Sequence, residues 1–253
     1  RSARLAAGRG PAGQVSTDAR AALCAGNNAC WCNAVGRAHG RPGEFRPALW
    51  LNRAAMPPYY PNAVTLTPDE TAAQLAATHE LAQTRPTCAV KDSFAALDLH
   101  PLGFDVLFDA TWLWRAADTP APAATGLVWS VVADAAGLAR WEAAWAGRDE
   151  PPAENERIFP PALLSEPGVA FLAGTRRDGI VAVAVANQTG AVVGLSNVYA
   201  PDGDTEAAYA GALALVGRLF PGRALAGYER GDDVAAARRV GFAPVGPLRV
   251  WAR

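Results

Sequence analysis

Lysine is almost absent from this chain of 253 residues, because Lys91 is the only one and the other 22 of its 23 Lys and Arg residues are arginine. Together with abundant alanine and glycine, this usage indicates a GC-rich bacterial genome. With 24 acidic residues the net charge is −1, which gives no long-range attraction toward phosphate backbones or anionic membranes. The charge therefore counts against nucleic-acid and membrane partners.

Long apolar runs are also missing. No run approaches the roughly twenty residues that span a bilayer, and the glycine-rich, arginine-containing start lacks the apolar core of a signal peptide. We therefore expect a soluble, cytoplasmic protein. Apolar residues still make up 51% of the chain, enough for the core of one large domain or two of ordinary size.

Cysteine and histidine are scarce, with four and three residues. Four cysteines in a chain of this length do not form a disulfide framework. The first three and His39 follow the spacing Cys-x5-Cys-x-Cys-x6-His, which matches none of the common zinc-finger patterns. We predict no metal site, but a helix over Asp18–His39 whose cysteines pack beside Leu23, Trp31 and Val35.

A proline- and alanine-rich passage at residues 118–125 has the composition of a linker between two halves. In the first half, residues 1–117, apolar patterns and turn residues predict strands and helices. The predicted strands are Pro47–Ala55, Asn62–Thr67, Thr87–Val90 and Asp105–Arg115. The predicted helices are Pro68–Ala82 and Ser93–Leu102.

The second half, residues 126–253, begins with an antiparallel meander, because residues 177–179 and 188–190 have hairpin-turn chemistry. The predicted strands are Leu127–Val132, Val169–Thr175, Ile180–Asn187, Ala191–Ala200, Ala224–Glu229 and Pro247–Ala252. The predicted helices are Asp134–Gly147, Asp204–Phe220 and Asp232–Val240.

The last sixty residues read strand, helix, strand, helix, strand, with Gly241-Phe242 just after the second helix. This order resembles the closing half of the GNAT superfamily of N-acetyltransferases. Cys88–Phe104 aligns with Ala226–Phe242 without gaps, which suggests a tandem arrangement. The resemblance implies an α/β (α+β) fold with a mixed, largely antiparallel sheet flanked by helices. An abbreviated N-terminal GNAT-like half would occupy residues 1–117, and a C-terminal GNAT-like domain residues 126–253.

The residues that usually bind acetyl-CoA in this superfamily differ here. The pyrophosphate-binding loop corresponds to Tyr199–Glu206, which has one glycine, no basic residue and three acids that would repel a pyrophosphate. We interpret it as a turn and an N-cap at Asp204. Ala237 stands in place of the family's general-acid tyrosine, and Arg230 in place of an asparagine that holds pantetheine. Standard acetyl-CoA-dependent catalysis is therefore disfavoured, and no cofactor is assigned; acetyl-CoA or another acyl thioester stays open as donor.

The resemblance also implies a ligand site where the fourth and fifth strands of the fold separate, here residues 194–199 and 227–230. The predicted catalytic residues are Glu229, Tyr228 and Ser196, with Glu229 as base for an amine. The predicted substrate-binding residues are Asn197, Tyr199 and Arg230. Alternatively, Tyr228 and Glu229 end a strand and bind Arg249 or a helix N-terminus.

Two further segments allow two interpretations each. Lys91 lies in the corresponding turn of the first half, where we interpret it as solvated rather than catalytic, because adjacent Asp92 disfavours a lowered lysine pKa. Residues 57–62, rich in proline and tyrosine, either line the cleft between the halves or only fix the start of the next strand.

Three hypotheses about function follow. The first is an N-acyltransferase-like protein that acts on an amine-bearing small molecule with a non-standard acyl donor or one bound to an acyl carrier protein. The second is a catalytically silent GNAT-like module that binds a metabolite or a protein. The third, aminoacyl transfer from tRNA, conflicts with the near-neutral charge.

Overall fold

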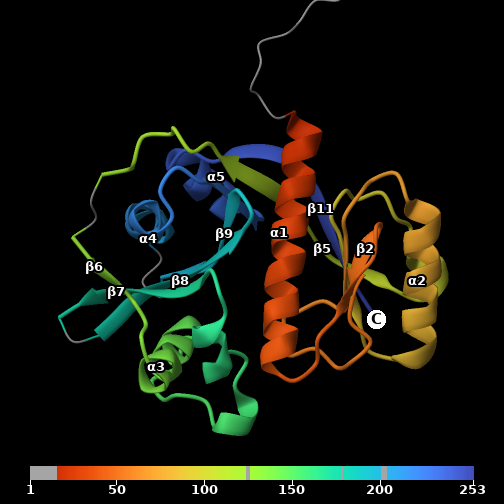
Figure 1. Cartoon of the computed structure of the whole chain (residues 1–253), viewed down its shortest axis with the longest axis horizontal. Coiled ribbons are helices and arrows are strands. Elements are labelled where there is room, and N and C mark those ends of the chain that lie inside the picture. Colours follow the sequence, from red (N-terminus) through yellow and green to blue (C-terminus); the bar gives the residue numbers. More distant parts are fainter. Residues whose placement is uncertain (1–15, 124–125, 178, 201–203) are drawn as a thin grey trace, which may run out of the picture.

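The computed structural model describes residues 16–123, 126–177, 179–200 and 204–253. In these residues eleven strands form one mixed sheet (Figure 1), in the order β1-β2-β3-β4-β11-β5-β10-β9-β8-β7-β6. The strands are β1 (Glu44–Phe45), β2 (Leu49–Leu51), β3 (Ala63–Thr65), β4 (Ala89–Asp92), β5 (Asp105–Arg115), β6 (Val128–Val131), β7 (Val169–Arg176), β8 (Gly179–Thr189), β9 (Val192–Tyr199), β10 (Ala224–Glu229) and β11 (Ala243–Ala252). The helices are α1 (Thr17–Ala38), α2 (Thr71–Thr84), α3 (Ala135–Trp145), α4 (Thr205–Leu219) and α5 (Asp232–Arg239).

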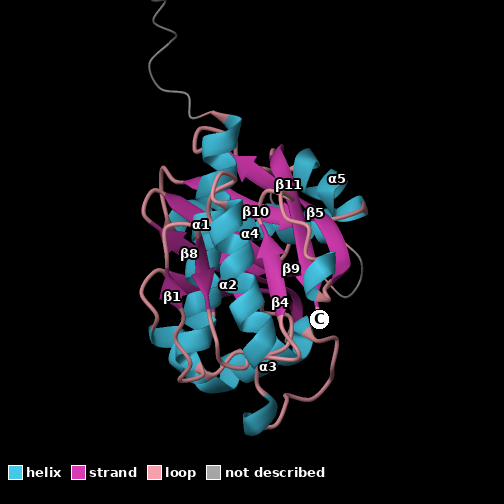
Figure 2. Cartoon of the chain, turned by 90° about the vertical axis from the view of Figure 1, so that its right-hand side faces the viewer, coloured by secondary structure: helices cyan, strands magenta, loops and turns pink. Residues whose placement is uncertain are grey.

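Helices cover both faces of the sheet, because alternate side chains of each buried strand point to opposite faces. In β7, Phe171 and Ala173 pack with α1 and α3, whereas Ala170 and Leu172 pack with α4. Helix α2 covers the strands of the first half on the face opposite α1. Helix α1 runs across the longest axis of the molecule, which is horizontal in Figure 1, and Figure 2 gives the view from the side of α2.

Two strand–helix–strand units repeat along the chain. The units β3-α2-β4 and β9-α4-β10 each pair their strands in parallel, and every other neighbouring pair among the described strands is antiparallel. The strand that follows each unit pairs with the other half: β5 pairs with β10, and β11 pairs with β4. The predicted mixed, largely antiparallel sheet flanked by helices is thus confirmed, and the repeated unit agrees with the predicted tandem arrangement. The boundary at residues 118–125 stays a prediction, and residues 124–125 lie outside the described ranges.

A steric constraint explains why residue 241 of the Gly241-Phe242 pair is glycine. Gly241 has φ +96°, and a Cβ there would lie 2.7 Å from Thr119 Cγ2, so a side chain would be strained twice. Phe242 then turns into the core, where its ring lies 5.9 Å from that of Tyr209 on α4. This glycine therefore connects α5 to β11 within one tight turn.

A buried ion pair holds the loop between α3 and β7. Glu142 on α3 accepts hydrogen bonds from Arg157 Nε at 3.2 Å and from the Ile158 amide at 2.6 Å. The loop then places Phe159 against Trp141, with ring centroids 5.2 Å apart. Because both charges are buried, the loop is fixed by polar as well as apolar contacts.

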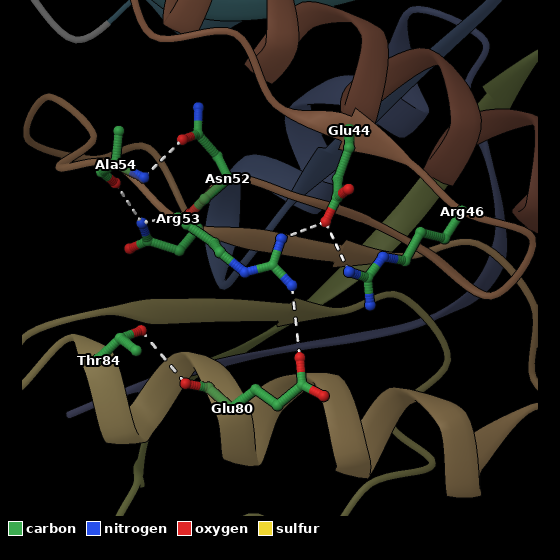
Figure 3. Close-up of polar contacts among 8 residues, drawn as sticks. Glu44, Arg46, Asn52, Arg53, Ala54, Glu80 and Thr84 are labelled. Carbon is green, nitrogen blue, oxygen red and sulfur yellow. Dashed lines mark hydrogen bonds and ion pairs between the residues drawn. The ribbon is translucent and has the colours of Figure 1, made fainter.

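An ion-pair network connects the sheet edge to α2 on the surface (Figure 3). Arg53 donates to Glu44 of β1 and, at 3.4 Å, to Glu80 of α2, and Arg46 also donates to Glu44. Exposed pairs of this kind contribute about 0–1 kcal/mol each. The network therefore orients the short edge strand more than it stabilises the fold.

Two sequence predictions in this part of the chain are wrong. The predicted helix Ser93–Leu102 is a turn that ends in a short 3-10 helix, His100–Leu102, because the Asp92 carboxylate accepts hydrogen bonds from the Phe94 and Leu97 amides and replaces the first helical turn. Leu23 was expected in the core, but its side chain is 42% exposed on α1. The helix containing it does form as predicted, as α1.

No helix among the described residues combines the length and apolar character needed to cross a membrane.

Candidate functional site

The sheet opens between β9 and β10. Their parallel pairing runs from Val192 to Gly194 on β9 and from Ala224 to Ala226 on β10, and stops there. On its other side β9 carries a bulge against β8, where Asn197 adopts φ +53°. Bulges bend a strand and redirect its side chains, often beside functional sites. The end of β9 thus turns away from β10 and leaves a gap.

A cavity of about 180 Å³ lies at this gap. It is enclosed by α1, by the loop before β3 and by the ends of β4, β9 and β10. The lining residues are Asn28, Trp31, Cys32, Tyr59, Tyr60, Lys91, Ser196, Asn197, Val198, Tyr228 and Glu229. Both halves of the chain therefore contribute to one cavity.

Tyr228 and Glu229 are neighbours on β10 but point to opposite faces of the sheet. Tyr228 lies on the α1 face, with its ring 5.5 Å from that of Trp112. Glu229 lies on the α4 face, where its carboxylate accepts a hydrogen bond from the Tyr209 hydroxyl. Both line the cavity, so the cavity gives access to groups from the two faces.

Lys91 is only 4% exposed and points under α1. Its ammonium donates to Asn28 Oδ1 at 2.9 Å and to the Tyr228 hydroxyl at 3.3 Å, and lies 4.4 Å from the centre of the Tyr228 ring. The prediction of a solvated turn lysine is wrong, because α1 covers the end of β4.

The pKa of Glu229 is raised from 4.5 to about 7, chiefly by burial; the hydrogen bond from Tyr209 lowers it and nearby Asp233 contributes to the rise. Burial also raises the pKa of Tyr209 well above 10, and the Glu229 carboxylate adds to that rise. Tyr209 therefore stays protonated and keeps donating. Near neutral pH, Glu229 exchanges between its acid and carboxylate forms, as a general base requires.

Four of the six predicted site residues line the cavity: Ser196, Asn197, Tyr228 and Glu229. The other two, Tyr199 and Arg230, do not line it. Tyr199 is largely exposed at the end of β9, and Arg230 lies 4.8 Å from the centre of the Phe108 ring.

The alternative partners proposed for Glu229 are also wrong. Arg249 pairs with Asp109 at 2.7 Å, and Glu229 binds the hydroxyl of Tyr209 in the second turn of α4, not the backbone amides of a helix N-terminus. The catalytic and binding roles of the cavity residues stay a prediction.

Several lining residues escaped sequence reasoning. Asn28, Trp31 and Cys32 come from α1, whose polar residues had no recognisable motif. Residues 57–62 were expected either at a cleft or as a simple strand entry, and Tyr59 and Tyr60 line the cavity. The contribution of α1 to the cavity could have been inferred from its two consecutive asparagines, which lie among alanine, glycine and cysteine residues. Buried asparagine side chains need hydrogen-bond partners.

The N-terminus of α4 is where the fold would bind a pyrophosphate. Asp204 caps this helix, since its carboxylate accepts from the Ala207 amide at 3.0 Å, as the sequence predicted. Glu206 in the first turn pairs with Arg239. Residues 201–203 of the predicted phosphate-loop equivalent lie outside the described ranges. The Asp204 carboxylate thus occupies one of the helix amides, and the acidic residues at this end of α4 disfavour a pyrophosphate.

Two of the three cysteines of α1, Cys24 and Cys32, are buried thiols. Burial raises the pKa of Cys24 to about 12 and that of Cys32 to about 11, which keeps both protonated and unreactive at neutral pH. His39 makes a 3.0 Å contact from Nε2 to the Ile158 carbonyl. These side chains therefore have structural partners of their own.

Comparisons with known proteins support the fold. No protein-family model matches the chain, and no curated protein matches its sequence. A GCN5-related N-acetyltransferase from Kribbella flavida has a TM-score of 0.64 at 17% identity, over 92% of this chain and 95% of that one. A conserved protein of unknown function from Staphylococcus epidermidis has a TM-score of 0.54 at 10% identity, over 81% and 83%. A GCN5-related N-acetyltransferase from Sphaerobacter thermophilus has 0.51 at 13%, over 76% and 71%. The chain is thus similar in structure to N-acetyltransferases across most of its length, and its fold is the GNAT fold.

Proposed function

We propose that this protein transfers an acyl group from a thioester to the amine of a small molecule, in the cavity where β9 and β10 separate. The observation that carries the proposal is the position of Glu229: a half-buried carboxylate, its pKa raised to about 7, that lines the same cavity as Ser196 and Tyr228. Catalytic bases work best when their pKa lies near the working pH.

The reaction needs a neutral amine, since a protonated amine has no free electron pair. Glu229 in its carboxylate form takes a proton from the amine nitrogen, which attacks the carbonyl carbon of the thioester. A C–N bond forms and the C–S bond breaks. The departing thiolate takes a proton from the Tyr228 hydroxyl, Tyr228 recovers a proton from the nitrogen as the amide forms, and Glu229 releases its own proton to solvent. The β9 backbone beyond Gly194 lacks its β10 partner and can hold an amide-containing acyl arm as an added strand would.

The donor in this proposal does not depend on a nucleotide. Asp204 and Glu206 at the start of α4 disfavour a bound pyrophosphate. A pantetheine arm on an acyl carrier protein is joined through a single phosphodiester and carries neither a pyrophosphate nor a nucleotide. We therefore propose an acyl-pantetheine unit as donor, and an acyl carrier protein as its source.

Release of free thiol from acetyl-pantetheine, with a mixture of primary amines as acceptors, tests the proposal, and mass spectrometry identifies the amide. The wild type should release thiol only when an amine is present. Glu229→Gln keeps the acceptor for Tyr209 but cannot take a proton, and should slow release by about 100-fold or more. Glu80→Gln, an exposed change on α2, serves as the matched control. Equal rates for wild type and Glu229→Gln would refute the role of the base.

A silent binding module is a second candidate, favoured by one observation. Asn27 and Asn187 exchange hydrogen bonds beside Gly194 and leave only about 10 Å³ of space above the gap between β9 and β10. A donor arm would have to enter from the other side of the sheet. Binding of amines without any thiol release, from acetyl-pantetheine or acetyl-CoA, would favour this candidate.

A further inference from the structure

The only lysine of the chain is a buried cation with neutral partners. Lys91 Nζ contacts an amide oxygen of Asn28, the hydroxyl of Tyr228 and the face of the Tyr228 ring. Within the described ranges it forms no salt bridge. A buried charge is costly to maintain unless it is paired. None of the ion pairs among the described residues supplies a counter-charge for this ammonium.

Two carboxylates that could supply that counter-charge, Asp92 beside Lys91 in the chain and Glu229 in the same cavity, are engaged elsewhere. Asp92, the next residue on β4, accepts from the Leu97 and Phe94 amides. Glu229 lines the same cavity but binds Tyr209 on the other face of the sheet. An ammonium has three N–H donors, and the hydrogen bonds to Asn28 and Tyr228 use two of them. One donor and one positive charge therefore remain for a ligand.

The cavity thus has two poles. Lys91 and Asn28 form a cationic, hydrogen-bonding pole beside α1, and Glu229 forms an acidic pole beside α4. Trp31, Tyr59 and Tyr60 add aromatic surface between the helix and the strands. A ligand that matches both poles carries a carboxylate at one end and an amine at the other.

We infer that the acceptor is an amino acid, whose carboxylate binds Lys91 and whose amine faces Glu229. A carboxylate provides both the missing charge and the missing acceptor, in a charge-assisted hydrogen bond that is stronger than a neutral one. The inference rests on the proposed function for the fate of the amine. Binding of the carboxylate can be tested without acyl transfer, because Lys91 contacts the ligand at a group that does not react.

Calorimetric titration of the wild type with each of the common L-amino acids tests the inference without any acyl donor. Each amino acid that binds is then compared with its decarboxylated amine. The amino acid should bind at least about tenfold more tightly, since the contact between an ammonium and a carboxylate contributes at least about 1.5 kcal/mol. Equal affinities for the two, or no binding by any amino acid, would overturn the inference.

Variants at position 91 separate a binding role from a structural one. Lys91→Met should remove the preference for the amino acid and leave affinity for the decarboxylated amine unchanged, whereas Lys91→Arg should keep the preference. Equal weakening of both ligands by Lys91→Met would mean that Lys91 only supports the fold. The wild-type comparison stands even if Lys91→Met fails to fold. Amino-acid binding without thiol release from acetyl-pantetheine would refute the acyl transfer and leave this inference intact.

Discussion

Replacing Glu229 with glutamine should remove a pH-dependent cost to stability. Burial raises the pKa of Glu229 from 4.5 to about 7 in the folded protein, so between these values the folded state binds more protons than the unfolded state. The free energy of unfolding of the wild type therefore falls as pH rises through this window. At about 1.4 kcal/mol per pH unit, the total loss is about 3 kcal/mol and is complete above about pH 8.

Urea denaturation of the wild type and Glu229→Gln at about pH 5 and about pH 8.5 measures this difference. Glutamine does not titrate, so the stability of the variant relative to the wild type should rise by about 2.5 kcal/mol between the two pH values, since a small part of the loss precedes pH 5. Glu80→Gln, exposed on α2, should show no comparable change. If the difference in free energy of unfolding between wild type and Glu229→Gln does not depend on pH, the raised pKa of Glu229 is refuted, and with it the proposed role as base.

Three further predictions concern the framework of the site, each measured by urea denaturation. Gly194→Ala should destabilise the protein by about 1–3 kcal/mol, because a Cβ there would overlap the side chain of Asn27; Gly26→Ala, with open space around it, should have no such effect, and equal losses would contradict the packing described. Glu142→Gln should cost about 3–5 kcal/mol, since it leaves the buried arginine of its ion pair without a counter-charge, and a neutral result would contradict that pairing. Asp204→Ala should cost about 1 kcal/mol through loss of the helix cap, whereas Asp204→Asn should restore most of it.

Local patterns predicted most of the elements. The bounds of β5 and β10 match the predicted strands Asp105–Arg115 and Ala224–Glu229, because their apolar residues recur at strand spacing and turn residues flank them. The helix over Ser93–Leu102 failed because one carboxylate, Asp92, satisfies the backbone amides in a turn. Helix propensity gives no warning of such a competing side chain.

The site was harder to predict, since its contacts join distant parts of the chain. Lys91 meets Asn28 across 63 residues and Tyr228 across 137. Its burial depends on where α1 crosses the sheet, and no local feature near Lys91 records that. Ser196 and Tyr228 could be anticipated because the resemblance to GNAT proteins specified where two strands separate. Tyr209, which binds Glu229 from α4, had no such signal and read as an ordinary helix residue.

The most direct test of the account compares the affinities of the wild type for acetyl-CoA and for acetyl-pantetheine, measured by calorimetry under the same conditions. If the acyl arm enters the cavity between β9 and β10 while the carboxylate of Asp204 caps the start of α4, the nucleotide of acetyl-CoA adds nothing to the binding affinity. The account then predicts that the two dissociation constants agree within about threefold, a difference below about 1 kcal/mol. Binding of acetyl-CoA about 100-fold more tightly than acetyl-pantetheine would show that the pyrophosphate is recognised after all, and would contradict the proposed donor.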